Sequence, residues 1–179
     1  MRMTRFLKWL AVIFAVPVVA AIVMAAVGAT LPREHAATRH VRLKSATPAA
    51  VWARISDEAT APTWRKELTR SVRLDDHNGH EVWGEEDTDG DTTAYETVEK
   101  RAPDLIVREI AGAIVFGGQW RIEIAPADGG TLVTITENGW VDPPPIRFLA
   151  HFVFGFTSSM DTYLRDLAVS FGEREAVIG

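Results

Sequence analysis

The stretch that decides the fold is residues 104–138, DLIVREIAGAIVFGGQWRIEIAPADGGTLVTITEN. Three segments within it, Leu105–Ile110, Gly118–Ala125 and Thr131–Asn138, are rich in β-branched residues or alternate between apolar and polar residues. This pattern predicts β-strands. The run Asp128-Gly129-Gly130 marks a turn between the last two segments. Because a parallel crossover needs a dozen or more residues, connections this short predict antiparallel pairing.

Further strands are predicted on the N-terminal side of this stretch. Turn signals at His77-Asn78-Gly79 and Asp89-Gly90 divide the preceding residues into short segments with a period of two. The strands predicted there are His35–Lys44, Thr69–Leu74, Glu81–Glu86 and Thr92–Lys100. Together with the three strands above, they predict a sheet of about seven strands.

Helices are predicted at three places around these strands. Thr47 and Pro48 are suited to cap and begin a first helix that residues 49–55 continue, and a second short helix or turn surrounds residues 61–64. A long helix is predicted from about Ile146 to Phe171. Its apolar stripe contains Leu149, Val153, Met160, Leu164, Leu167 and Phe171. This order of elements predicts an α+β domain with its helices on one face of the sheet.

The order of the elements and several short motifs resemble the SRPBCC superfamily, the START-like helix-grip proteins that include polyketide cyclase/dehydrase-type domains. The resemblance covers roughly Pro32 to Glu173. The motifs are Pro48-Ala49-Ala50-Val51-Trp52, Pro62-Thr63-Trp64-Arg65, Gly117-Gly118-Gln119-Trp120, Thr134-Ile135-Thr136-Glu137-Asn138-Gly139 and Asp161-Thr162-Tyr163-Leu164-Arg165-Asp166-Leu167. The resemblance implies a curved antiparallel sheet wrapped on a long C-terminal helix, with a deep apolar cavity between them. It is specific to the fold and not to a ligand or reaction.

The N-terminal residues differ sharply from the rest of the chain. Residues 10–29 form a run of 20 residues without a charge, and a helix of that length covers about 30 Å, the hydrocarbon thickness of a bilayer. Three basic residues precede the run: Arg2, Arg5 and Lys8. Because positive flanks stay cytoplasmic, we expect a cytoplasmic segment 1–9, a transmembrane anchor 10–29 and one extracytoplasmic domain 30–179. A signal peptide cleaved near Ala29 is the alternative.

The composition excludes several classes of function. After the three basic leader residues are set aside, 16 basic residues face 24 acidic ones, a net charge of −8. An acidic surface of this kind does not suit nucleic acid. The chain contains no cysteine, which excludes disulfides, thiolate metal sites and cysteine nucleophiles.

No motif indicates a metal, a cofactor or a nucleophile. The run Asp87-Thr88-Asp89-Gly90-Asp91 has acidic residues at alternate positions, but Thr92 and Val98 occupy the glycine and glutamate positions of an EF-hand loop. The five histidines form no HxH or HExxH pattern, and no GxSxG elbow is present. We therefore expect a solvated acidic turn, no metal site and no cofactor.

Glu137 is the one candidate, and a weak one, for a catalytic residue. It shares a face of its predicted strand with Val133 and Ile135. If that face is turned inward, Glu137 lies at the end of the cavity and could serve as an acid or base. The alternative is that it lies past the buried region and meets solvent or Arg121.

Aromatic side chains supply the candidates for ligand binding. Trp83 and Tyr95 belong to neighbouring predicted strands, where they either line a cavity wall or belong to the core. Phe148 and Phe154 fall outside the stripe of the long helix and either form an apolar rim or pack under a loop. The full set of ligand-binding candidates is Trp83, Tyr95, Trp120, Phe148, Phe152, Phe154 and Phe156.

These features favour a membrane-tethered domain that binds or carries an apolar small molecule such as a lipid, a quinone or a polyketide-like compound. A cyclase or dehydratase of an aromatic polyketide-like substrate is the first alternative, with Glu137, Tyr95 or a histidine as acid–base group. A regulatory domain that binds a protein partner and holds no ligand is the second. The fold alone does not decide between them.

Overall fold

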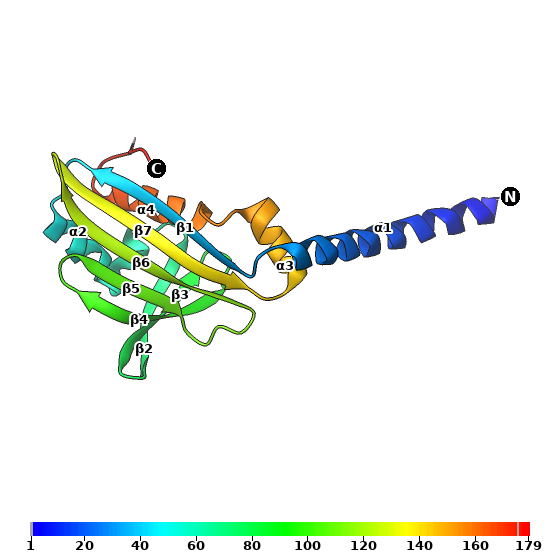
Figure 1. Ribbon diagram of the computed structural model, residues 1–179, viewed down its shortest axis with the longest axis horizontal. Helices are drawn as coiled ribbons and strands as arrows, with labels where there is room; N and C mark the ends of the chain where they lie inside the picture. Colours follow the sequence, from blue (N-terminus) through cyan, green and yellow to red (C-terminus); the bar gives the residue numbers. More distant parts are fainter. Residues whose placement is uncertain (1, 175) are drawn as a thin grey trace. The chain divides into compact units, whose positions relative to one another are not determined.

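The computed structural model describes residues 2–174 and 176–179, with side chains from residue 15 onward (Figure 1). The chain forms two compact units. The helical unit contains the residues up to Glu34 together with Val141–Gly155, and the sheet unit contains His35–Trp140 and Phe156–Gly179.

The helical unit consists of helix α1 (Arg2–Thr30), helix α3 (Pro144–Leu149) and a single π-helical turn, η2 (Ala150–Phe154). Gly28 allows α1 and α3 to approach closely, because a Cβ atom at this position would lie 1.8 Å from the carbonyl oxygen of Pro144. A glycine is therefore required where the two helices meet.

Arg147 ties the helical unit together. Its guanidinium donates to the backbone carbonyl oxygens of Val141 at 3.0 Å, Leu31 at 2.9 Å and Asp142 at 2.6 Å. Three backbone carbonyl oxygens of the helical unit thus accept hydrogen bonds from one charged side chain. In a single helix from Ile146 to Phe171, Arg147 would lie opposite the apolar stripe and face solvent. In the structure its side chain is buried.

The predicted membrane anchor, residues 10–29, begins among residues whose side chains lie outside the described part. Helix α1 extends over this segment, and its exposed apolar side chains include Val16, Val18, Val19, Ile22, Val23 and Val27. Over the part of the chain that the structure describes, no helix is long and apolar enough to cross a membrane. The transmembrane element of the prediction is therefore not supported by the structure.

All seven predicted strands are present and form one sheet. The strands are β1 (Glu34–Leu43), β2 (Leu68–His77), β3 (His80–Asp87), β4 (Thr92–Arg101), β5 (Leu105–Ile110), β6 (Phe116–Ala127) and β7 (Gly130–Val141). Their order across the sheet is β1-β7-β6-β5-β4-β3-β2. The pairs from β2 to β6 are antiparallel neighbours in sequence, as expected for a meander.

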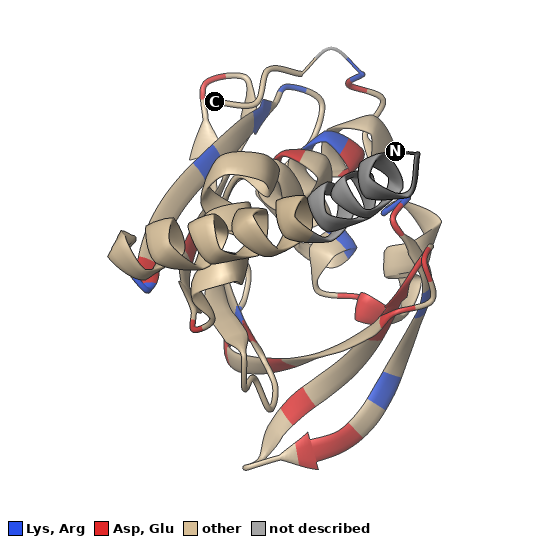
Figure 2. Ribbon diagram, turned by 90° about the vertical axis from the view of Figure 1, so that its right-hand side faces the viewer, with Lys and Arg blue, Asp and Glu red and all other residues tan. Residues whose placement is uncertain are grey.

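The turns follow from the residues that the sequence places between the strands. Asn78 and Gly79 both have a positive φ, 52° and 83°, which is the conformation that a two-residue hairpin requires. In the acidic turn, the carboxylate of Asp87 accepts from the backbone N–H groups of Asp89 and Asp91 at 2.9 Å each. This carboxylate therefore stabilises the turn itself. Figure 2 shows further acidic residues along the hairpin of β2 and β3.

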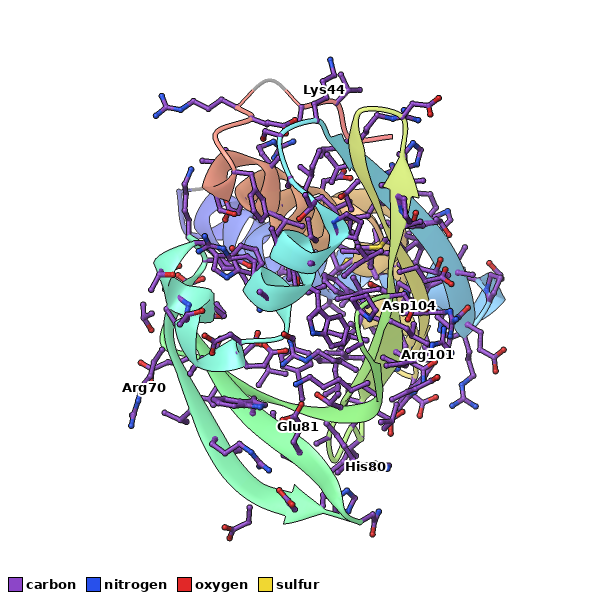
Figure 3. All side chains as sticks on the ribbon, turned by 90° about the vertical axis from the view of Figure 1, so that its left-hand side faces the viewer. Lys44, Arg70, His80, Glu81, Arg101 and Asp104 are labelled. Carbon is purple, nitrogen blue, oxygen red and sulfur yellow. The ribbon has the colours of Figure 1, made fainter. Side chains whose placement is uncertain are left out.

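The hydrophobic core lies between the concave face of the sheet and two helices, α2 (Pro48–Ile55) and α4 (Ser158–Ser170). Thr47 caps α2 by accepting from the backbone N–H of Ala50 at 3.3 Å, as the sequence predicts. The core residues of the strands are Val41, Leu43, Ile106, Ile122, Ile124, Val133 and Ile135, and those of the helices include Val51, Ile55, Met160, Leu164 and Leu167. The curvature of the sheet is visible in Figure 3.

The predicted long C-terminal helix, Ile146–Phe171, is wrong in its first half. The chain forms α3 and η2, breaks at Gly155, and begins α4 only at Ser158. Gly155 has a φ of 72°, which ends a right-handed helix and which glycine adopts without a steric penalty. The helix that packs on the sheet is therefore α4, of 13 residues. Arg39 of β1 holds its start, with Nε donating to Asp161 at 2.9 Å.

Candidate functional site

Polar and aromatic side chains gather on the concave face of strands β3, β4 and β5. Trp83 lies opposite Tyr95 in the register of β3 and β4, and Thr97 lies opposite Arg108 in that of β4 and β5. Directly opposed residues of an antiparallel pair point to the same face. Figure 3 shows Glu81 of β3 pointing into the curve of the sheet, where its carboxylate meets Lys100 Nζ at 2.7 Å.

A network of two arginines and two glutamates is the main polar feature of this face. Arg65 Nη1 donates to Glu85 Oε2 at 2.7 Å, and Arg108 Nη2 donates to Oε1 of the same carboxylate at 2.8 Å. Arg108 Nη1 lies 3.3 Å from Glu58 Oε2. All four side chains are buried, with exposed fractions of 11 % for Arg65, 9 % for Arg108, 6 % for Glu58 and 3 % for Glu85.

The short 3-10 helix η1 (Glu58–Thr63) brings two members of this network to the sheet. Glu58 begins η1, and Arg65 follows directly after its end. The backbone N–H groups of Trp64 and Arg65 both donate to the carbonyl oxygen of Ala61, at 3.1 and 2.9 Å. These hydrogen bonds close the last turn and fix the position of Arg65. Sequence reasoning placed a short helix here but did not identify either charged residue as part of a site.

Aromatic rings surround the two guanidinium groups. Arg108 lies over the ring of Tyr95 at 4.8 Å from its centroid, and Arg65 lies over the ring of Tyr163 at 5.2 Å. Trp64 and Trp120 meet the ring of Tyr163 edge-on, at centroid distances of 5.2 and 5.7 Å. Cation–π contacts of this kind stabilise a guanidinium that has lost its water.

The pKa values of the two carboxylates are shifted in opposite directions. Burial pushes the pKa of the Glu85 carboxyl upward, but the guanidinium groups of Arg108 and Arg65 outweigh burial and hold this pKa below its ordinary value. At Glu58 burial is the largest effect and raises the pKa of the carboxyl, although Arg108 opposes it. Arg65 also has a partner at the edge of the network, because its Nε donates to Glu67 Oε1 at 2.9 Å.

Several buried polar atoms of this face have no hydrogen-bond partner among the described residues. They include Arg108 Nε, Trp64 Nε1 and the hydroxyl groups of Thr97 and Ser71. Thr97 lies directly opposite Arg108, and Ser71 lies directly opposite Glu85. Native proteins rarely leave buried polar groups unpaired. Four such atoms around one ion-pair network therefore mark this region as the candidate functional site.

Glu137 forms a second polar group on the concave face. Its carboxylate is bound by His35 at 2.8 Å and by the indole of Trp120 at 2.5 Å. Its role as an acid or base stays a prediction. Arg121, the predicted alternative partner, instead lies 3.1 Å from Glu123. No sequence pattern indicated that His35, 102 residues away, would be the partner of Glu137.

The other ligand-binding candidates are divided between the two units. Trp83, Tyr95, Trp120 and Phe156 belong to the sheet unit, where Phe156 stacks on the ring of His35 with centroids 3.9 Å apart. Phe148, Phe152 and Phe154 belong to the helical unit, where Phe148 and Phe152 contact each other at 4.9 Å and Phe154 is exposed. Their role in ligand binding stays a prediction.

Binding of a metal ion would require a group of ligating side chains among the described residues. Histidine, aspartate and glutamate side chains in this part of the chain form no group of three that could hold one. His77 and His80 each donate to a different oxygen of Glu96, at 2.6 and 2.7 Å.

Comparison with known proteins identifies the fold. The solved structure of the Zhui aromatase/cyclase from Streptomyces sp. R1128 superimposes with a TM-score of 0.61 at 14 % identity, covering 79 % of this chain and 95 % of that one. A START superfamily protein from Mycobacterium smegmatis gives a TM-score of 0.58 at 17 % identity, covering 78 % and 98 %. The di-domain aromatase/cyclase StfQ of the steffimycin pathway gives 0.59 at 14 %, covering 79 % and 52 %.

The chain thus spans about half the length of the di-domain aromatase/cyclases that it matches. No curated protein matches it in sequence. The sequence profile described as "Polyketide cyclase / dehydrase and lipid transport" matches residues 34–171, which is well over half of the chain and includes both polar groups of the concave face. The protein therefore belongs to the polyketide cyclase/dehydrase and lipid transport family.

Proposed function

We propose that the sheet unit binds an apolar small molecule that carries oxygen acceptors, and holds those oxygens against the donors around Arg108. The observation that carries this proposal is the set of buried donors without a partner: Arg108 Nε, Trp64 Nε1 and the hydroxyl of Thr97. The predicted apolar cavity between the sheet and α4 is part of the proposal.

The unpaired atoms of the network favour an acceptor as the polar part of the ligand. Arg108 Nε, Trp64 Nε1 and the Thr97 hydroxyl are donors without a partner among the described residues. Glu67 Oε2 also lacks a partner there, but Arg65 Nε already donates to the other oxygen of this carboxylate at 2.9 Å. A carbonyl, enol or phenol oxygen would accept from the free N–H groups and recover about 1–3 kcal/mol per unpaired donor. A ligand that offered further donors would compete with Arg65 and Arg108 for Glu85.

The surroundings of the donors favour a largely apolar ligand. The rings of Tyr95 and Tyr163 cover the two guanidinium groups, and Trp120 continues the aromatic surface towards Glu137. Aromatic walls with a few directed polar atoms are typical of small-molecule sites. Quinones, polyketide-like compounds and lipids with a carbonyl group all combine these features, and the family description names both polyketide chemistry and lipid transport.

Two probes of similar shape test this proposal with the full-length chain in detergent, with empty micelles as the blank. We expect 2-hydroxy-1,4-naphthoquinone, which has acceptor oxygens, to quench tryptophan fluorescence at lower concentration than naphthalene, which has none. Thr97→Val should weaken quinone binding about five-fold, because a neutral hydrogen bond contributes about 1 kcal/mol. Naphthalene binding should not change.

The matched control is Thr134→Val, since Thr134 lies on the face of β7 opposite to the core residues Val133 and Ile135. It should leave the affinity for both probes unchanged. Equal binding of the two probes, or equal effects of the two valine substitutions, would contradict the assignment of the donors. Absence of binding for both probes would favour the partner-binding alternative.

We also propose that residues 10–29 attach the protein to a membrane, with the sheet unit outside the cytoplasm. Support comes from the uncharged run of 20 residues, from the basic residues Arg2, Arg5 and Lys8, and from apolar side chains of α1 that are 50 % or more exposed between Val16 and Val23. A reporter fused after Gly179 should then be active only outside the cytoplasm. Cytoplasmic activity would reverse the orientation, and a mature form cleaved near Ala29 would replace the anchor by a signal peptide.

A further inference from the structure

His35 and Glu137 form a closed polar group at the other end of the concave face. Glu137 Oε1 lies 2.8 Å from His35 Nε2, and Glu137 Oε2 accepts from the indole N–H of Trp120 at 2.5 Å. Each carboxylate oxygen thus has one strong partner. The side chains of His35 and Glu137 are 14 % and 18 % exposed, so water screens their interaction only in part.

Gly139 makes this arrangement possible. A Cβ atom at Gly139 would lie 2.4 Å from His35 Cε1 and 2.6 Å from Nε2, so any other residue would displace the imidazole ring. The ring also stacks on Phe156, with centroids 3.9 Å apart and planes at 21°. The ring is therefore held between a glycine, an aromatic ring and a carboxylate, which fixes its orientation.

The hydrogen bond to Glu137 selects the tautomer of the imidazole. Glu137 Oε2 already accepts from Trp120, and an ionised carboxylate can only accept, so the proton between His35 and Glu137 belongs to His35 Nε2. In the neutral ring Nδ1 then carries a lone pair. Among the described residues of the sheet unit, His35 has a side-chain hydrogen bond through Nε2 and none through Nδ1. This is the arrangement of a histidine base that is oriented by a carboxylate.

We propose that His35 is a general base and Glu137 its positioning residue, and that the pair removes a proton from a carbon next to a carbonyl group of the bound molecule. The proposal rests on the proposed function, because it needs a ligand on the concave face. The C–H bond breaks, the proton goes to His35 Nδ1, and the bonding pair forms the C=C bond of an enolate as the carbonyl π pair moves to oxygen. Return of the proton from His35 to another carbon or to the oxygen completes a tautomerisation, with no oxidant or reductant.

The role of Glu137 in this step is to stabilise the imidazolium that forms. A carboxylate on Nε2–H favours the protonated ring once Nδ1 has accepted a proton. The indole of Trp120 keeps the second oxygen of Glu137 in place, and its ring also meets Tyr163 at 5.7 Å. Tyr163 in turn contacts Arg65 of the ion-pair network. A chain of contacts thus connects the base with the proposed oxygen-binding donors.

The experiment uses 5-nitrobenzisoxazole, an apolar aromatic probe for a general base. Loss of its C3 proton breaks the ring N–O bond, turns the C–N unit into a nitrile and releases a coloured phenolate. The full-length chain in detergent should accelerate this reaction above empty micelles. His35→Gln and Glu137→Gln should each lose on the order of 10²-fold in rate, the usual contribution of a general base. His40→Gln, an exposed histidine of the same strand, should retain the rate.

A second measurement does not depend on catalysis. In the ¹⁵N spectrum of histidine-labelled protein, His35 Nδ1 should be unprotonated in the wild type. In Glu137→Gln the amide oxygen can accept from Trp120 while the amide N–H donates to His35 Nε2, which should move the ring proton to Nδ1. A wild-type ring protonated at Nδ1 would overturn the proposal.

The outcomes separate this proposal from the proposed function. A wild-type rate that His35→Gln leaves unchanged, or no acceleration although the probe quenches tryptophan fluorescence, would overturn the assignment of His35 as a base and leave ligand binding intact. Failure of the probe to bind would count against the proposed function, and the tautomer of His35 would then decide whether the base is correctly assigned.

Discussion

Replacing Glu85 by glutamine is expected to lower the free energy of unfolding by about 3–5 kcal/mol, because it leaves two buried guanidinium groups without their shared carboxylate. Arg65 and Arg108 each donate to a different oxygen of Glu85, at 2.7 and 2.8 Å, and Glu85 is only 3 % exposed. Glu58 is no substitute for the shared carboxylate, because among the described residues its ion pair is with Arg108 alone, at 3.3 Å. Urea denaturation of the full-length chain, followed by tryptophan fluorescence, measures the change.

The control for this prediction is Glu123→Gln. Glu123 pairs with Arg121 at 3.1 Å, but their side chains are 49 % and 39 % exposed. An ion pair in solvent contributes about 0–1 kcal/mol, so this change should be small. If Glu85→Gln destabilised the protein no more than Glu123→Gln, the buried network would contribute no more to stability than a surface ion pair, and its role in holding Arg65 and Arg108 in place would have to be given up.

The sheet could be predicted from the sequence because its signals are local. Residues of opposite polarity alternate within each strand, and turn residues such as Asn78-Gly79 separate neighbouring strands, so both position and pairing follow from short segments. Leu105–Ile110 was predicted with the bounds that the structure has. Longer strands such as β7 extend past the predicted bounds, because Gly139 and Trp140 break the alternation without ending the pairing.

The ion-pair network could not be predicted because it depends on register and on distance in sequence. Glu85 and Arg108 lie on β3 and β5, with β4 between them, and Arg65 comes from the segment after η1. The β4–β5 pairing also contains an irregularity between Thr97 and Glu99. A shift of one residue reverses the face on which a side chain lies, so no count along the sequence could have brought these charges together.

Glu137 shows how far the same kind of reasoning extends when the register is simple. Its position two residues beyond Ile135 placed it on the same face of β7 as the core residues, but left open whether it lies inside the buried region or past its end. Its partner His35 is on β1, which is adjacent to β7 in the sheet but lies at the opposite end of the sequence. Arg121, which lies on the neighbouring predicted strand, was the alternative partner for Glu137. In the structure Arg121 pairs with Glu123 instead.

The second large expected effect is a loss of stability on substitution in the C-terminal helix. The predicted continuous helix and the observed broken helix lead to different expectations for Val153 and Leu164. One continuous helix places Val153 and Leu164 on the same apolar stripe, so alanine at either position would open a cavity. The structure breaks the helix at Gly155, leaves Val153 61 % exposed, and buries Leu164 completely in the core between α4 and the sheet.

We therefore expect Leu164→Ala to lower the free energy of unfolding by about 2–5 kcal/mol, as buried leucines do when a cavity replaces them. Val153→Ala should change it by no more than about 0.5 kcal/mol, because it removes exposed methyl groups only. Urea denaturation of both variants beside the wild-type chain measures the two effects. Equal destabilisation by the two substitutions would mean that Val153 is buried on the sheet after all. The continuous helix would then be correct, and Gly155 would not mark the start of the segment that packs on the sheet.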